Sequence, residues 1–101
     1  MAKPRAMVMN PADNTATVVD TIEPGSTVQL AVGGQISSML VTEKIPFGHK
    51  FALSDIPKGS RIIKYAETIG IATKDIKAGQ HVHVHNLESG RGRGDRLFLQ
   101  N

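Results

Sequence analysis

The chain has 101 residues and no cysteine, and its 12 lysine and arginine residues against 9 acidic residues give a net charge of +3. This length predicts one domain whose core has little stability to spare, which favours support from a partner subunit or from a second copy of the chain. The missing cysteines exclude disulfides, thiolate metal sites and a cysteine nucleophile. The mild charge, with one tyrosine and three phenylalanines, argues against a nucleic-acid partner.

The sequence carries no pattern for export or for a membrane. The N-terminus has no apolar run long enough for a signal peptide. No stretch approaches the roughly 20 apolar residues that a membrane-spanning helix needs. We therefore expect a cytoplasmic protein without a membrane partner.

Short runs of apolar and β-branched residues, each ended by turn residues, follow one another from the start of the chain. Residues 6–9 and 15–19 are separated by asparagine, proline and aspartate and predict one hairpin. Residues 28–32 and 36–41 are separated by Gly33-Gly34-Gln35 and predict another. Strand, turn and strand thus alternate through the first half of the chain.

The second half continues in the same way, with strands expected at residues 51–53, 62–65 and 68–72. Ala66-Glu67 is the only hint of helix and is too short to nucleate one. Many short strands with frequent glycine and proline corners predict a mainly β protein, a compact folded-over sheet or a small barrel.

One corner pattern occurs three times: Thr or Asp, then Ile, two variable residues, Gly, two more residues, and Val or Ile. An apolar anchor followed by a glycine that is free to take a positive φ predicts a tight turn that packs its isoleucine into the core. The unequal spacing excludes a solenoid repeat. The three copies occupy residues 21–28, 55–62 and 75–82.

Histidine alternates with valine from His81 to His85, and Asn86 follows. Alternation predicts a strand with the three imidazoles on one face and with Val82 and Val84 buried on the other. Same-face neighbours on a strand lie about 6.6 Å apart, so at most two of these histidines chelate one ion. The alternative is a strand whose solvent face is merely rich in histidine.

The runs Ile45-Pro46-Phe47-Gly48-His49-Lys50-Phe51-Ala52-Leu53 and His81-Val82-His83-Val84-His85-Asn86 resemble the N-terminal SAF-type domain of the altronate dehydratase family, whose relatives include galactarate dehydratase and sulfolactate sulfo-lyase. The resemblance extends from about Met7 to Asp95. It implies a β-clip fold, a sugar-acid substrate with altronate leading, and a larger catalytic domain or subunit. We therefore expect the small subunit of a sugar-acid hydro-lyase, inactive alone, which acts with a separate large catalytic subunit.

Position on the expected strand ranks the candidate catalytic residues. His85 and Asn86 come first, because they lie where the strand leaves the sheet and near the glycine- and arginine-rich segment; His83 follows and His81 is last. The resemblance implies that the fold brings His49 and Lys50 alongside. A divalent metal, iron, is expected mainly on the large subunit, with His83 and His85 as added ligands. The substrate carboxylate needs cations, for which the candidates are Lys50, Arg91 and Arg93.

Each assignment has a non-functional alternative. His49 would then be a loop histidine hydrogen-bonded to the backbone, and Lys50 a solvated surface charge. We expect residues 1–89 to form the SAF-type domain and residues 90–101 a flexible glycine- and arginine-rich tail. Two other functions remain open, the small subunit of a sulfolactate sulfo-lyase and a non-catalytic SAF-type binding or regulatory module. A homo-oligomer in isolation also remains open.

Overall fold

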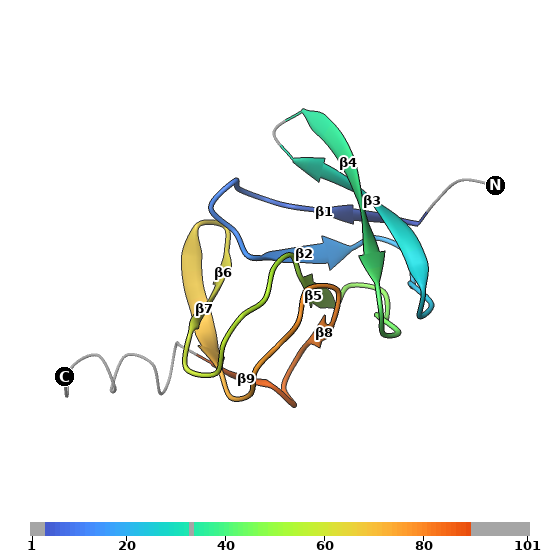
Figure 1. The fold of residues 1–101 in the computed structure, drawn as a ribbon. Coiled ribbons are helices and arrows are strands. Elements are labelled where there is room, and N and C mark those ends of the chain that lie inside the picture. Colours follow the sequence, from blue (N-terminus) through green and yellow to red (C-terminus); the bar gives the residue numbers. More distant parts are fainter. Residues whose placement is uncertain (1–3, 33, 90–101) are drawn as a thin grey trace.

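The computed structural model describes residues 4–32 and 34–89. These residues form two antiparallel-rich sheets and contain no helix, so the expected mainly β class is confirmed, and no helix in this part is long and apolar enough to cross a membrane (Figure 1). The strands are β1 (Arg5–Met7), β2 (Thr15–Val18), β3 (Ser26–Val32), β4 (Gln35–Val41), β5 (Lys50–Ala52), β6 (Arg61–Lys64), β7 (Glu67–Ala72), β8 (His81–Val82) and β9 (Leu87–Ser89).

The larger sheet has six strands in the order β4-β3-β1-β2-β5-β8, and the smaller has the order β6-β7-β9. Both expected hairpins are present, because β1 pairs antiparallel with β2, and β3 with β4. β1 also pairs parallel with β3, which joins the two hairpins into one sheet. The short β9, which the sequence pattern did not indicate, pairs with β7. The expected tail at residues 90–101 lies outside the described residues.

The corner device is present and occurs four times in the described residues, not three. Each corner buries its isoleucine, has its glycine at a φ between 81° and 88°, and closes with a backbone hydrogen bond of 2.9–3.2 Å across the turn. A positive φ at the third turn position defines a type II turn and explains why glycine stands there. The corners are residues 22–25, 45–48, 56–59 and 76–79.

The four corners associate in two pairs through reciprocal backbone hydrogen bonds, Ile22 with Ile45 and Ile56 with Ile76. A side-chain oxygen just before one isoleucine accepts the N–H of a turn residue in the paired corner. Asp75 thus accepts from Lys58, Asp55 from Ala78, and Thr21 from Phe47. The fourth corner has Lys44 at this position, and its counterpart in the paired corner is Pro24, which has no N–H to donate.

Each isoleucine pair belongs to its own apolar core. Ile22 and Ile45 pack with Phe51 and the buried residues of β1 to β4, whereas Ile56 and Ile76 pack with Val82 beside the smaller sheet. β5 joins the two cores, since Phe51 belongs to the first and Ala52 to the second. The chain is thus folded over at β5, the strand that joins the two cores. The segment just before β5 and the segment around β8 lie next to each other there.

The β6–β7 hairpin turns at Tyr65 and Ala66, which both have a positive φ. Ala66-Glu67, the segment judged too short to nucleate a helix, thus forms part of this turn and the start of β7. The buried carboxylate of Asp13 stabilises this strained turn, because its oxygens accept the N–H groups of Tyr65 at 3.0 Å and Ala66 at 2.7 Å.

Candidate functional site

His49 is placed by the corner at residues 45–48. Its N–H donates to the carbonyl of Pro46 across the turn at 2.9 Å, and its carbonyl accepts the N–H of Val18 at 2.9 Å. β5 begins at the next residue, Lys50. The backbone of His49 is thus fixed on both sides, while its half-buried side chain lies at the lip of the sheet.

His81 is placed by the corner at residues 76–79 and by the pairing of β8 with β5. In this register His81 lies opposite Phe51. Its N–H donates to Oε1 of Glu43 at 2.9 Å. His49 and His81 therefore stand in similar places, each just after a corner and each next to the junction of β5 and β8.

The strand expected from His81 to His85 is wrong beyond Val82, and so is the expected burial of Val84. β8 ends at Val82, the chain turns, and Val84 is 80% exposed. Asn86 causes this turn: its Oδ1 accepts the N–H of His83 at 3.0 Å, and its Nδ2 donates to the carbonyl of His81 at 2.8 Å. An amide that bonds the backbone locally offers the chain an alternative to a continued ladder.

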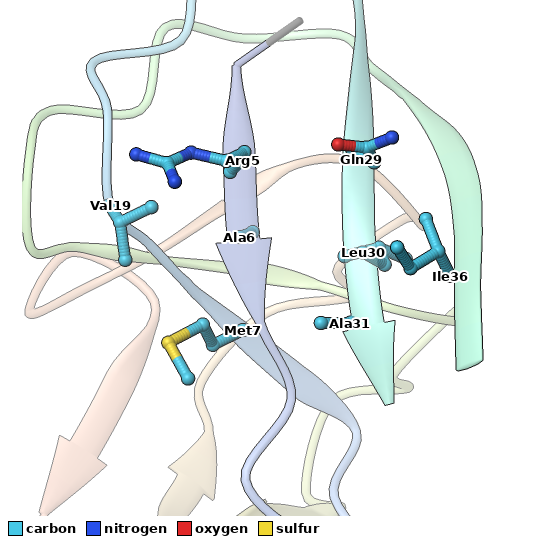
Figure 2. A pocket seen from close by; sticks show the side chains of 8 residues that line it. All are labelled: Arg5, Ala6, Met7, Val19, Gln29, Leu30, Ala31 and Ile36. Carbon is cyan, nitrogen blue, oxygen red and sulfur yellow. The ribbon is translucent and has the colours of Figure 1, made fainter. Parts of the chain in front are cut away.

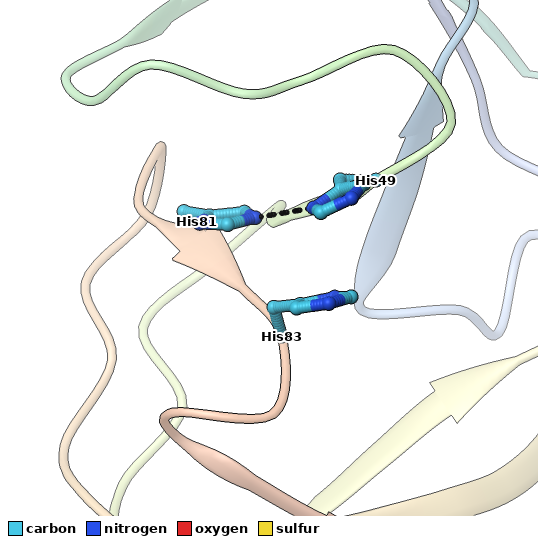
Figure 3. Close-up of side chains that lie close together, drawn as sticks. All are labelled: His49, His81 and His83. Atoms are coloured by element: carbon cyan, nitrogen blue, oxygen red, sulfur yellow. Dashed lines mark hydrogen bonds between the residues drawn. The ribbon is translucent and has the colours of Figure 1, made fainter.

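The turn gathers the imidazoles instead of spacing them along a strand (Figure 3). Nδ1 of His49 lies 2.9 Å from Nε2 of His81, and the ring of His83 stacks on that of His49 with centroids 4.1 Å apart. His49, His81 and His83 each offer one nitrogen, and these three atoms lie within 4.8 Å of one another. We call these three residues the histidine cluster.

His85 lies next to the histidine cluster but not in it. Its ring centroid is 5.1 Å from that of His81, with the planes tilted by 38°, and its side chain is exposed. The spacing argument for a straight strand is therefore wrong, because the turn brings the outer two histidines close together. The geometry groups His83 with His49 and His81, whereas the sequence pattern suggested His83 with His85.

Burial and neighbouring basic groups favour uncharged side chains in this region. Burial, and then the nearby His85, His49 and His83, lower the pKa of His81 below its ordinary value, although Glu43 opposes this. Burial and the nearby His49, Lys50 and His85 likewise lower the pKa of His83. A neutral imidazole accepts a proton or binds a metal ion, whereas a protonated one does neither.

The other expected site residues are placed as follows. Lys50 is half-buried in β5, and burial followed by the charge of Lys64 lowers the pKa of its ammonium group. Asn86 is buried, with both ends of its amide bonded to backbone, so its observed contacts are those of a residue that positions the loop. Arg91 and Arg93 lie outside the described residues.

Sequence reasoning missed Glu43, and it ranked His81 last. The signal for His81 was its place near a corner, since it is the second residue after Gly79, whereas His49 directly follows Gly48 of the corner at residues 45–48. That fourth corner was hidden because it lacks the Thr or Asp that defined the pattern.

A shallow hollow of about 420 Å³ lies at the other end of the larger sheet, over β1, β3 and β4 (Figure 2). Its lining is mostly aliphatic, with Met7, Leu30 and Ile36 among the residues that contribute. Arg5 is the one cation among its lining residues, and its Nε already lies 3.5 Å from Oδ2 of Asp20. Because this lining offers few polar groups, we place the candidate site at the histidine cluster rather than in this hollow.

Comparison with known proteins gives consistent matches. A family model described as the altronate/galactarate dehydratase SAF domain matches residues 4–90. The chain is 43% identical over 88 residues to altronate dehydratase of Escherichia coli strain K12, covering 87% of the chain but 17% of that protein. It is 35% identical over 88 residues to (2R)-sulfolactate sulfo-lyase subunit alpha of Chromohalobacter salexigens, covering 83% of the chain and 94% of that subunit.

A shorter match joins the chain to galactarate dehydratase (L-threo-forming) of Escherichia coli strain K12, with 50% identity over 40 residues, which are 40% of the chain and 8% of that protein. The chain thus spans less than a fifth of the length of the two dehydratases, and nearly the whole length of a lyase subunit.

Proposed function

The chain belongs to the altronate/galactarate dehydratase SAF-domain family, and from this we propose that it is the small subunit of a sugar-acid hydro-lyase that works with a separate large catalytic subunit. The observation that carries the proposal is the match along 94% of a relative that is named as one subunit of a lyase. Altronate is the leading substrate, because altronate dehydratase is 43% identical over 87% of the chain.

The proposed reaction breaks a C–H bond beside the substrate carboxylate and a C–O bond on the neighbouring carbon, and water leaves. A base must take the first proton, and an acid must deliver a proton to the departing hydroxyl. A divalent metal held mainly by the large subunit, for which we propose iron, would act as a Lewis acid on that hydroxyl.

We propose His85 as the proton donor of this subunit. Its imidazole is exposed beside the histidine cluster, at a turn that can enter a partner's cleft. His83 and His49 are the neighbouring imidazoles that share this surface, and Asn86 holds the turn through its two backbone hydrogen bonds. The proposed contribution of Asn86 to catalysis is thus to hold this turn, and with it the histidines, in position.

We propose that Lys50 binds the substrate carboxylate, together with Arg91 and Arg93 from the segment after β9. Lys50 is half-buried at the start of β5, immediately after His49, and its charge acts on His83. A cation held beside imidazoles in this way would place the acid group of a substrate next to the proton donor.

The alternative with a specific observation in its favour is the small subunit of a sulfolactate sulfo-lyase, since a relative that the chain covers along 94% of its length has that name. Purifying the chain with a dehydratase-type large subunit and assaying altronate, galactarate and sulfolactate separates these functions. We expect turnover of altronate only after mixing. Turnover of sulfolactate alone would favour the alternative, and a chain that binds no large subunit would favour a non-catalytic module.

A further inference from the structure

We propose that His49, His81 and His83 form a binding site for a divalent first-row transition metal ion on this domain itself. The proposal does not depend on the hydro-lyase function, because the ion would be held by side chains of this chain alone. It concerns a different set of residues from the His83 and His85 pair that the sequence pattern suggested.

The distances suit one ion. Two imidazole nitrogens bound to the same ion at about 2.0–2.1 Å in tetrahedral geometry lie roughly 3.3 Å apart, so only a small separation of His49 and His81 is needed. Nδ1 of His49 and Nε2 of His81 are already 2.9 Å apart, and the nitrogen of His83 is within 4.8 Å of both. The His83 ring is stacked on that of His49 with the planes 19° apart, so it would have to rotate out of this stack to complete a three-nitrogen face, and its partial exposure leaves room for that.

The scaffold brings these ligands together before any ion binds. His49 follows one corner, His81 follows another, and the β5–β8 pairing fixes one relative to the other. Asn86 fixes the backbone of His83 by accepting its N–H. A site that is organised in advance loses less conformational freedom on binding, so its affinity exceeds that of two histidines on a flexible loop.

The donor set indicates the class of ion. Three imidazoles with no thiolate suit Zn²⁺, Ni²⁺, Co²⁺, Fe²⁺ and Cu²⁺, whereas Mg²⁺ and Ca²⁺ require oxygen ligands. Three protein ligands leave at least one position for water, a substrate oxygen or a ligand from a partner. Such an open arrangement is typical of working metal sites rather than of purely structural ones.

Binding would also rearrange one proton. The 2.9 Å contact between His49 and His81 requires one of these two nitrogens to carry hydrogen. An ion that takes both lone pairs must displace that hydrogen, which then moves by way of solvent to the other nitrogen of the same ring, so that the ring stays neutral.

Isothermal titration calorimetry on the full chain without a polyhistidine tag tests the proposal. We expect one Zn²⁺ or Ni²⁺ ion per chain and no binding of Mg²⁺. His49→Gln, His81→Gln and His83→Gln should each weaken Zn²⁺ binding by a factor of about 100 or more, whereas the matched variant His85→Gln should change it by less than about threefold. Thermal melting of each variant checks that it is folded.

Two results would overturn the proposal: Zn²⁺ binding that His49→Gln leaves unchanged, or a wild-type chain that binds no Zn²⁺. NMR of the wild-type imidazole nitrogens provides a test that needs no variant. Zn²⁺ should shift the ring signals of His49, His81 and His83 much more than those of His85. Equal shifts of His83 and His85, without a shift of His49, would assign the ion to the loop pair instead.

Discussion

Nδ1 of His49 lies 2.9 Å from Nε2 of His81, although the two residues are 32 positions apart in the sequence. The contact exists because each histidine follows a glycine corner and because β5 and β8, the strands next to these corners, pair with each other. Corners that serve the fold therefore also assemble the imidazoles. Variants of the corners and of the turn after β8 test this account separately from catalysis.

Because the chain turns after β8, the same substitution should affect the free energy of unfolding very differently at Val82 and at Val84. Val84→Asp should change the free energy of unfolding by no more than about 0.5 kcal/mol, because its side chain is 80% exposed. Val82→Asp should unfold the domain, because Val82 is 0% exposed and an unpaired buried carboxylate costs several kcal/mol. Urea denaturation measures both, and equal losses would mean that the chain continues as a strand through Val84.

Asn86 should contribute to stability through its two backbone hydrogen bonds. Asn86→Ala leaves the N–H of His83 and the carbonyl of His81 without their partner, and we expect a loss of about 1–3 kcal/mol in the free energy of unfolding.

Asn86→Asp is the matched control. Its carboxylate still accepts the N–H of His83, but its other oxygen would face the carbonyl of His81 in a buried position, so its loss in urea denaturation should be at least as large as that of Asn86→Ala. An Asn86→Ala protein as stable as wild type would contradict this description of the turn.

The paired corners make Asp55 and Asp75 stabilising although both are exposed. Asp55→Ala removes the acceptor of the Ala78 N–H and should cost about 1 kcal/mol, whereas Asp55→Asn keeps an acceptor oxygen and should cost less than half of that. The asparagine variant also removes the weak 3.9 Å ion pair with Lys77, so it separates hydrogen bonding from charge. Equal losses in the two variants, measured by thermal melting, would assign the effect to charge.

Two corner glycines with the same φ differ in the space around them. Gly25→Ala meets nothing within 4 Å and should cost only the strain of a positive φ, about 1–2 kcal/mol. In Gly79→Ala the added methyl would also lie 2.6 Å from the carbonyl oxygen of Leu40, so we expect a clearly larger loss and a disturbed His81. Chemical denaturation compares them, and equal losses would show that β4 moves freely away from the corner.

Local patterns predicted much of this fold. The strand runs, both hairpins and three of the four corners are readable because each depends on residues that are close in sequence. The fourth corner was missed for a physical reason: the Thr or Asp before isoleucine serves the partner corner, and Pro24 removes the N–H that such a residue would accept. A pattern built on that polar residue therefore could not include Ile45.

The candidate site was less predictable, because two different structures share its sequence signal. Alternating His and Val suits a strand, but Asn86 offers the backbone of His81 and His83 a competing set of hydrogen bonds, and these form instead. The contact between His49 and His81 depends on how β5 pairs with β8, and no local spacing contains that information.

The central claim is our proposal that this chain supplies an imidazole to a hydro-lyase reaction, and the most direct measurement is the turnover of altronate by the proposed assembly of the chain and a large subunit with His85→Gln. We predict a fall in kcat by a factor on the order of 100, as loss of a general acid typically causes, while subunit association, melting temperature and Zn²⁺ binding stay near wild type. Turnover within about twofold of wild type in a fully assembled complex would contradict the claim and leave the histidines of this domain with a role outside the reaction.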